Sequence, residues 1–126
     1  MRAAVQNNIQ AGMRAQKAAE EYLCKNGFSM IEANFRAPNA EIDLIMQDGD
    51  YIVFVEVKYR QSLEYGLPRE AVGPHKQKQI KKAAMHFIVR NRLTSQDFRF
   101  DVVEVLGGVG PDLNGMKVNH IENAFW

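Results

Sequence analysis

The stretch EIDLIMQDGDYIVFVEVKYR, residues 41–60, decides the fold and raises the question of function. Two runs rich in Ile, Val and Phe flank the turn signal Asp48-Gly49, a pattern typical of a β-hairpin. Charged residues nevertheless stand inside these apolar runs rather than at the turn. They are Glu41, Asp43, Glu56 and Lys58. Because an isolated carboxylate is costly to bury, their presence in predicted strands needs an explanation.

The alternation of side chains along a strand predicts where these charges lie, because residues two apart share a face. On residues 50–58 both faces begin apolar, which predicts a central strand covered on both sides. If the turn signal forms a two-residue loop, Asp43 lies opposite Phe54. Glu41 then lies opposite Glu56, and all of the charged side chains share one face of the hairpin.

Such an acidic face is expected to be offset by cations, because like charges directly opposed in a sheet are destabilising. Lys58 supplies one positive charge. A divalent ion that prefers oxygen ligands is the natural further one, since Mg²⁺ needs only one or two carboxylates completed by water and substrate phosphate. The alternative is a hairpin end that faces solvent, where charged residues are ordinary.

The rest of the sequence predicts a single α/β domain over residues 1–126. Predicted helices cover 9–26 and 76–92, predicted strands cover 28–36, 41–47, 50–58 and 98–106, and 117–125 is a last short strand or tail. This order of elements predicts a mixed central sheet with helices against its faces. We expect residues 1–8 to be flexible, 61–75 to be irregular and 107–116 to form a mobile loop.

Composition indicates a soluble globular protein of the cytoplasm. Hydrophobic residues make up 46% of the chain and charged residues 25%, as in ordinary globular domains. No apolar run reaches the roughly 18 residues of a membrane span, and the first residues lack the apolar core of a signal peptide. The single cysteine, Cys24, excludes an internal disulfide and fits a reducing compartment. We therefore expect no membrane partner.

Basic residues are concentrated in residues 58–92, which contain nine of them and two acidic residues, a net charge of +7. Residues 1–57 have a net charge of −3. This asymmetry predicts a polyanionic partner such as DNA. The second predicted helix turns its lysines outward and buries Ile80, Ala83, Ala84, Phe87 and Ile88. The residues expected to contact phosphate are Arg36, Arg60, Lys76, Lys78, Lys81 and Lys82. Such contacts position DNA without reading its sequence; the alternative is an ordinary solvated helix face.

A family resemblance rests on the same residues. Asp43, followed by Glu56-x-Lys58 at the end of the next strand, resembles the active-site motif of the PD-(D/E)xK nuclease superfamily, which includes restriction endonucleases and Holliday-junction resolvases. The chain is more closely similar to the YraN family of small bacterial endonuclease-like proteins. The matching stretches are AGMRAQKAAEEYL, NFR, EIDLI, FVEVK, Lys76-Gln77, RFDVV and NAF, which span nearly the whole chain.

The resemblance implies a restriction-endonuclease-like sheet flanked by helices and a metal-dependent endonuclease acting on DNA, including branched DNA. It implies that Asp43 and Glu56 bind Mg²⁺ or Mn²⁺, with Glu41 as a further candidate ligand on the same face. It also implies that Lys58 activates water and stabilises charge on the phosphate. These roles agree with what phosphodiester hydrolysis requires. Cutting both strands of a junction needs two copies, so we expect a weak homodimer.

One departure from the family pattern concerns the first helix. The family usually carries a Glu there in a Gly-Glu pair, but alignment on Tyr22-Leu23 places Gln16 at that position. Gln16 can position a water molecule but brings no negative charge, and Glu20, one turn later, is the nearest replacement. Two alternatives therefore stay open. One is a catalytically weak or inactive module that binds nucleic acid or a protein partner; the other is an adaptor whose hairpin charges are merely solvated.

Overall fold

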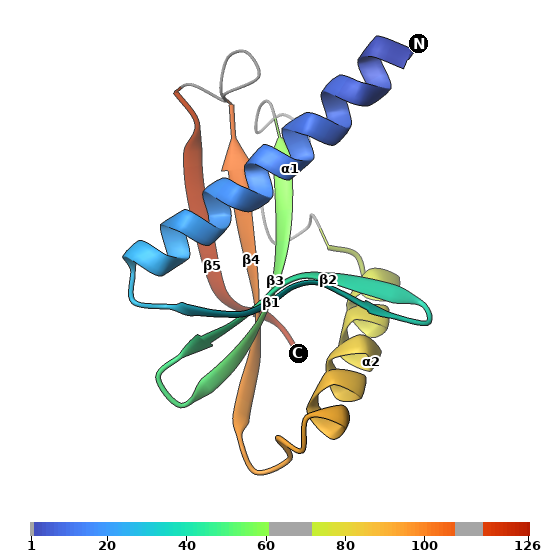
Figure 1. Ribbon diagram of the computed structural model, residues 1–126, viewed down its shortest axis with the longest axis vertical. Coiled ribbons are helices and arrows are strands. Elements are labelled where there is room, and N and C mark those ends of the chain that lie inside the picture. The colour runs from blue at the N-terminus through green and yellow to red at the C-terminus, as the bar shows by residue number, and fades with distance from the viewer. Residues whose placement is uncertain (1, 61–71, 108–114) are drawn as a thin grey trace.

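The computed structural model describes residues 2–60, 72–107 and 115–126, with side chains described from residue 10 onward. Its elements are α1 (Arg2–Lys25), β1 (Ser29–Ala37), β2 (Ala40–Asp48), β3 (Tyr51–Arg60), α2 (Pro74–Arg90), β4 (Asp97–Leu106) and β5 (Lys117–Phe125). The strands form one mixed sheet in the order β1-β2-β3-β4-β5, with α1 and α2 on opposite faces (Figure 1). The α/β class is confirmed, and the architecture is consistent with a restriction-endonuclease-like fold.

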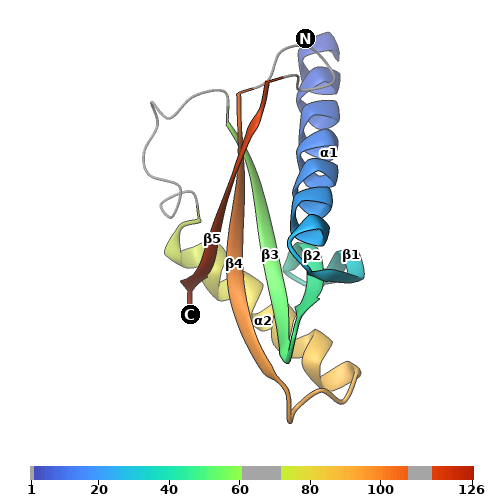
Figure 2. The same ribbon diagram turned by 90° about the vertical axis from the view of Figure 1, so that its left-hand side faces the viewer.

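The sheet changes strand direction at its centre. β1, β2 and β3 are antiparallel neighbours, β3 and β4 are parallel, and β4 and β5 are antiparallel. Parallel neighbours need a crossover connection, and here that connection contains α2. Figure 2 shows the sheet between the two helices. β3 is therefore the central strand, with β4 beside it along its whole length and β2 on its other side from Tyr51 to Val55.

Two apolar cores lie on the two faces of β3. Ile52 and Phe54 pack toward α2, whereas Val53 and Val55 pack toward α1, which confirms the prediction of a strand covered on both sides. The residues that α2 buries are the ones predicted: Ile80, Ala83, Ala84, Phe87 and Ile88. In the part of the chain that the structure describes, neither helix is long and apolar enough to cross a lipid bilayer.

Some boundaries differ from the prediction. α1 begins at Arg2 instead of at residue 9, because the added residues include neither Gly nor Pro and continue the helix. The flexibility expected for residues 1–8 stays a prediction. Residues 117–125 form a strand rather than a tail. Most of the predicted irregular segment, residues 61–71, and most of the predicted mobile loop, residues 108–114, lie outside the described residues.

The β2–β3 hairpin turns one residue later than predicted. Asp48 pairs with Tyr51, so the loop consists of Gly49 and Asp50. Gly49 has a φ of +59°, which glycine adopts without steric cost. A glycine at the first central position is what a type II′ turn requires. The later turn leaves each strand residue on its predicted face but changes the residue opposite it.

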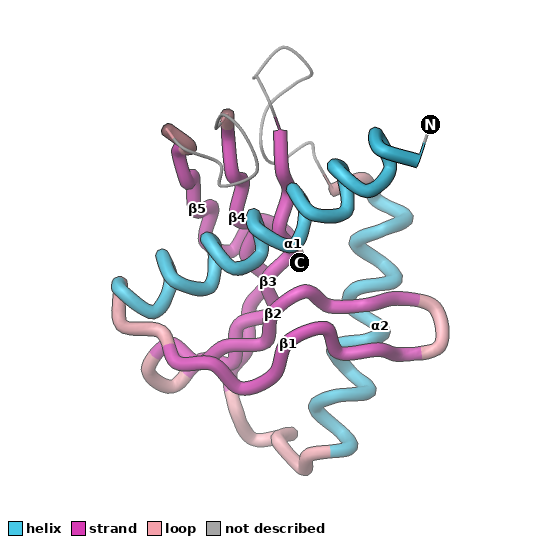
Figure 3. Tube along the Cα trace, turned by 45° about the horizontal axis from the view of Figure 1, so that its top comes forward, coloured by secondary structure: helices cyan, strands magenta, loops and turns pink. Residues whose placement is uncertain are grey.

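β2 separates from β3 before either strand ends. The last β2–β3 pair is Leu44 with Val55, whereas β1–β2 pairing continues to Ala37 with Ala40. The paired end of β1 and β2 therefore leaves the sheet, and Figure 3 shows it passing across α2. The separation begins where the charged residues of β2 and β3 begin.

Candidate active site

Asp43 lies at the point where β2 leaves β3. Its Oδ2 accepts the backbone N–H of Val57 at 2.8 Å. This N–H belongs to β3 beyond its last paired residue, so the carboxylate takes the place of the missing strand partner and satisfies a backbone donor. The bond fixes the Asp43 side chain against the end of β3 that carries Glu56 and Lys58.

The predicted cross-strand partners of the acidic residues are wrong. Phe54 pairs with Ile45 rather than with Asp43. The same register carries Asp43, instead of Glu41, to the level of Glu56. The physical reason is the later turn, which shifts every pair of the ladder. The two carboxyls that meet are consequently Asp43 and Glu56, and each shifts the pKa of the other.

Glu56 is buried in an environment that disfavours its charged form. The residue is 6% exposed, and its Oε2 has no hydrogen-bond partner among the described residues. Burial, reinforced by the charge of Asp43, raises the pKa of Glu56 to about 8 against the opposing effect of Lys76 and Lys58. The Lys58 Nζ lies 4.0 Å from the Glu56 Oε1. Glu56 therefore keeps a proton at neutral pH unless a further cation arrives.

Lys76 adds a positive charge from a second element. It lies in the first turn of α2, and its charge lowers the pKa of both acids. Burial nevertheless raises the pKa of Asp43 above its ordinary value, against the hydrogen bond from Val57 and the charge of Lys76. The structure thus brings together Asp43, Glu56, Lys58 and Lys76, which the sequence placed in three separate segments.

The paired carboxyls fit a hard divalent cation. Within the described parts of the chain the buried Oε2 of Glu56 lacks a partner, and both groups offer the oxygen ligands that Mg²⁺ and Mn²⁺ prefer. Among the described residues no group of three or more His, Cys, Asp or Glu side chains is placed to hold a metal ion. Protein ligands would therefore be Asp43 and Glu56, with water and substrate completing the shell. When bound, such an ion polarises a phosphoryl oxygen and promotes ionisation of water.

The third candidate ligand, Glu41, pairs with Arg36, although its charge still helps to raise the pKa of Asp43. Its Oε2 is 3.5 Å from the Nε of Arg36, and the two side chains are 40% and 85% exposed. Both residues sit on the part of the β1–β2 hairpin that has left the sheet. Their predicted roles in metal and phosphate binding stay predictions.

Gln16 and Glu20 line a groove between α1 and β1 together with Asn34. The Gln16 Nε2 donates to the Asn34 Oδ1 at 3.0 Å. The residues on either side of Asn34 pair with those on either side of Asp43, so Asn34 lies at the level of Asp43 on the neighbouring strand. Gln16 is therefore hydrogen-bonded to the residue that lies beside Asp43 on the neighbouring strand. The catalytic roles predicted for Gln16 and Glu20 stay predictions.

The remaining lysines of α2 lie on its outward face, as predicted. Lys78, Lys81 and Lys82 line a shallow groove with Met85 and Val89. Lys78 and Lys82 are exposed and Lys81 is half-buried. A row of ammonium groups on one helix face can follow a phosphate backbone, but contact with nucleic acid stays a prediction.

Glu104 is a buried acid that sequence reasoning missed. It is fully buried on β4, and its Oε2 lies 3.2 Å from the Nε of Arg60. The parallel register places Glu104 beside Lys58. Arg60, expected to contact phosphate, is therefore partly neutralised by an internal partner. The available signal was an acid inside an apolar strand, the same observation that singled out the hairpin.

A second missed acid, Asp101, lies on the α1 face of β4 and is fully buried. Its Oδ2 is 2.7 Å from the His120 Nε2, and its Oδ1 accepts the backbone N–H of Asn123 at 2.9 Å and the Arg99 Nε–H at 3.0 Å. Burial opposes ionisation, but the hydrogen bonds from His120, Arg99 and Asn123 outweigh it and lower the pKa of Asp101. This carboxylate is satisfied internally, so its role is structural.

Comparison with known proteins assigns the chain to a family. Residues 15–105 match the model described as Uncharacterised protein family UPF0102. The UPF0102 protein of Acetivibrio thermocellus is 43% identical over 121 residues, covering 94% of this chain and 93% of the relative. That of Clostridium acetobutylicum is 45% identical over 118 residues, covering 94% and 95%. With Asp43, Glu56 and Lys58 inside the matched region, the chain belongs to the UPF0102 family, the YraN family that its sequence resembles.

Proposed function

We propose that this protein is a metal-dependent nuclease that hydrolyses phosphodiester bonds in DNA, including branched DNA formed during repair or recombination. The observation that carries the proposal is the pairing of half-buried Asp43 with buried Glu56. Two neighbouring carboxyls, one with a buried oxygen that has no partner among the described residues, form a site whose charged state needs a cation. A bound Mg²⁺ or Mn²⁺ would supply that cation, since either ion can be held by one or two carboxylates completed by water and substrate phosphate.

The cations around the pair have distinct roles in this proposal. Lys58 lies 4.0 Å from Glu56 and can orient the attacking water and stabilise the negative charge that develops on the phosphate. Lys76 approaches from α2 and can neutralise a phosphate next to the scissile bond. Asp43 and Glu56 hold the metal ion. Glu104 pairs with Arg60 and so holds the end of β3, which carries Glu56 and Lys58, in position.

The outward lysines of α2 are the proposed DNA backbone contacts. Lys78, Lys81 and Lys82 continue from Lys76 along one helix, so a strand bound to them leads to the acidic pair. Contacts of this kind carry little sequence information, so DNA shape is expected to decide the preference. Cutting both strands of a junction needs two sites, and we retain the weak homodimer as part of the proposal.

A second candidate function is nucleic-acid binding without cleavage. It is favoured by Gln16, which stands where the family usually has an acid, and by the absence of a third acidic ligand among the described side chains. In this case the acidic pair would bind metal weakly, and the lysine face would still bind DNA. A protein partner on the same surface is the remaining version of this alternative.

The test is a cleavage panel of linear, nicked, flapped and four-way DNA with Mg²⁺ or Mn²⁺. Wild type is compared with Asp43→Asn and with Asp50→Asn, a matched control at the exposed hairpin turn. Cleavage by wild type and the control, but not by Asp43→Asn, supports the nuclease. Binding without cleavage under any metal favours the second function. A protein that neither cuts nor binds DNA or RNA at low salt contradicts both.

A further inference from the structure

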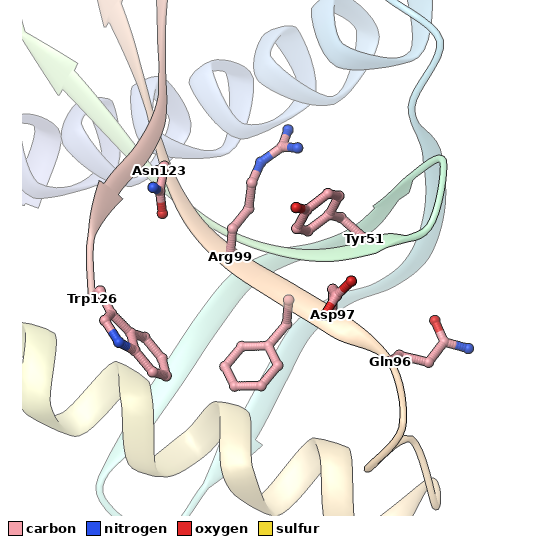
Figure 4. A pocket seen from close by; sticks show the side chains of 7 residues that line it. Tyr51, Gln96, Asp97, Arg99, Asn123 and Trp126 are labelled. Atoms are coloured by element: carbon pink, nitrogen blue, oxygen red, sulfur yellow. The ribbon is translucent and has the colours of Figure 1, made fainter.

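A pocket lies at the end of β3 and β4 opposite the acidic pair. It is a hollow of about 500 Å³, within the range of ligand sites. Figure 4 shows its side chains around the beginning of β4. The residues that matter for its chemistry are Tyr51, Gln96, Asp97, Phe98, Asn123 and Trp126. None of them belongs to the proposed catalytic machinery.

The pocket lies beside the beginning of β4, which β5 does not reach. Pairing of β5 with β4 begins at Phe100 with Phe125, so within the described chain residues 97–99 have a strand partner, β3, on one side only. Asn123 has a left-handed φ of +50° in the irregular stretch of β5. The open edge of a strand presents backbone donors and acceptors to whatever enters.

Exposed aromatic rings form the walls of this pocket. Trp126 is 75% exposed, yet its ring packs on Phe98 and Phe100 with centroid distances of 5.5 and 5.8 Å. Tyr51 is 42% exposed, and the Arg99 guanidinium lies 5.5 Å from its ring centroid. The two rings stand on opposite faces of the sheet, Trp126 on the α2 face with Phe98 and Tyr51 on the α1 face with Arg99, so they flank the open edge of β4 from its two sides. Such surfaces can bind a planar group by stacking.

The charges exclude a simple anion site. The Arg99 guanidinium is already paired with Asp101 and Asp48, each at 3.0 Å. Asp97 adds an exposed carboxylate to the rim. The side chains of Gln96 and Asn123 can both donate and accept hydrogen bonds. These features favour a neutral, planar group with a polar edge, which is the description of a nucleobase.

The lysine groove of α2 leads directly to this pocket. The Lys81 Nζ lies 5.7 Å from the centroid of the Trp126 ring. Lys81 also lines the groove with Lys78 and Lys82. Lys76, which acts on the acidic pair, is five residues away on the same helix, about 7.5 Å along its axis. Positive charge therefore extends from the acidic pair to the aromatic pocket.

We propose that the pocket binds an unstacked base of a single-stranded nucleic-acid segment whose backbone follows the lysines of α2. A basic groove combined with exposed aromatic rings is how proteins bind single strands without sequence preference. Tyr51 and Glu56 are five residues apart on β3, about 17 Å. The substrate class is thus DNA with an unpaired segment a few nucleotides from the point of cleavage. The position of this unpaired segment relative to the point of cleavage rests on the proposed function, whereas the binding of a base in the pocket does not.

Trp126 is the single tryptophan of the chain, so its fluorescence reports on the pocket directly. The probe is an oligothymidine of about ten nucleotides, which matches the length bound by small single-strand-binding folds, and the comparison is a blunt duplex of equal length. EDTA prevents cleavage. We expect saturable quenching and tighter binding with the single strand. Tyr51→Ala and Trp126→Ala should each weaken oligothymidine binding, measured by anisotropy, about tenfold, and Trp126→Phe should bind nearly as wild type.

Tyr22→Ala, which removes an exposed aromatic ring on α1, is the matched control and should bind as wild type. Equal quenching by single strand and duplex, or unchanged affinity in Tyr51→Ala, overturns the proposal. Fluorescence that changes with protein concentration in the absence of DNA also overturns it, since a second copy then fills the pocket. Loss of binding in the pocket variants without any cleavage by wild type supports the pocket and counts against the nuclease. If wild type cuts flapped DNA in an Asp43-dependent manner and Trp126→Ala cuts it equally well, the nuclease is supported and the pocket is contradicted.

Discussion

The carboxylate of Asp43 is bound to the backbone of Val57, with 2.8 Å between Oδ2 and N. This one contact ties β2 to the strand segment that carries Glu56 and Lys58, at the place where the strand ladder itself has ended. Asp43 consequently has two separable properties. Its oxygen satisfies a backbone donor, and its charge opposes the ionisation of Glu56.

Asp43→Asn separates these properties. The amide oxygen can still accept the N–H of Val57, while the negative charge is removed. We expect cleavage to be abolished, DNA affinity to stay equal or improve, and the midpoint of thermal unfolding not to fall, because the crowding with Glu56 is relieved. Asp43→Ala also loses the hydrogen bond and should be less stable than Asp43→Asn by about 1–3 kcal/mol. Cleavage by Asp43→Asn at the wild-type rate would remove Asp43 from the catalytic site.

Glu56 gives the metal-free protein a pH-dependent stability. Its pKa is raised from 4.5 to about 8 in the folded state. Folding therefore takes up a proton between these values, and the free energy of unfolding should fall as the pH rises from about 4.5 to about 8 and then level off. Glu56→Gln, a neutral replacement of similar shape, should flatten this profile. Urea unfolding in EDTA across that pH range measures how the free energy of unfolding of wild type and of Glu56→Gln changes with pH. Identical slopes for the two proteins would contradict the raised pKa of Glu56.

The same proton competes with a metal ion. Because a ligand carboxyl must be deprotonated, Mg²⁺ affinity should rise with pH up to about 8, and binding should release protons. Calorimetry in two buffers of different ionisation enthalpy detects this release. Asp50→Asn, at the exposed turn, should bind Mg²⁺ and release protons as wild type does.

Gln16→Glu tests whether the missing acid of α1 limits metal binding. The added carboxylate would lie near Asn34, at the level of Asp43 on the neighbouring strand. We expect it to lower the Mg²⁺ concentration that gives half-maximal cleavage. Glu20→Gln is measured in parallel. If Gln16→Glu has no effect and Glu20→Gln loses activity, Glu20 fills the role in place of Gln16.

The lysine face of α2 predicts a change in salt dependence. On duplex DNA each phosphate neutralised contributes about −0.9 to the slope of log K against log salt. Replacing Lys78, Lys81 and Lys82 by Ala should therefore make the slope shallower by up to about 2.7 and weaken binding to all sequences alike. The matched control removes three exposed lysines elsewhere: Lys17, Lys25 and Lys117. An unchanged slope in the α2 variant would place the DNA surface on another face.

Asp101 predicts a purely structural effect. Asp101→Asn leaves the guanidinium of Arg99, whose side chain is 12% exposed, without its buried counter-charge. Leaving a buried charge without a partner typically costs about 3–5 kcal/mol. Because Asp48 still lies 3.0 Å from Arg99, we expect the loss here to be smaller. Because the pKa of Asp101 is lowered from 3.8, its stabilising effect is present above that value and is lost as the pH falls below it. Denaturant unfolding of Asp101→Asn against Asp97→Asn, an exposed acid on the same strand, measures the difference.

The sequence allowed much of this site to be predicted. Alternation along β3 indicated a strand with two apolar faces, and the spacing along α2 identified the side chains it buries. Both signals are local and repeat over several residues. Face assignment survived the error in register, because moving the turn by one residue shifts paired positions by two and preserves their parity.

Other features could not be predicted, because they depend on weak local differences or on long-range contacts. Either Asp48-Gly49 or Gly49-Asp50 satisfies a turn preference, and the choice of Asp48-Gly49 gave Asp43 the wrong partner. The position of Glu104 beside Lys58 requires knowing that β3 and β4 are parallel neighbours. The Asn34 contact of Gln16 depends on how α1 docks on the sheet.

The parallel pairing of β3 with β4 also bears on the order in which the chain folds. The bond between Asp43 and Val57 closes a loop of 14 residues, whereas each β3–β4 pair joins residues 46 positions apart. Loop-closure entropy favours the shorter loop, so the antiparallel hairpin meets first and the strand beyond the helical crossover later. The two acids thus come together while water still surrounds them, and the arrival of α2 and β4 removes that water. The free-energy cost of removing the two carboxyls from water therefore arises in the last stage of folding.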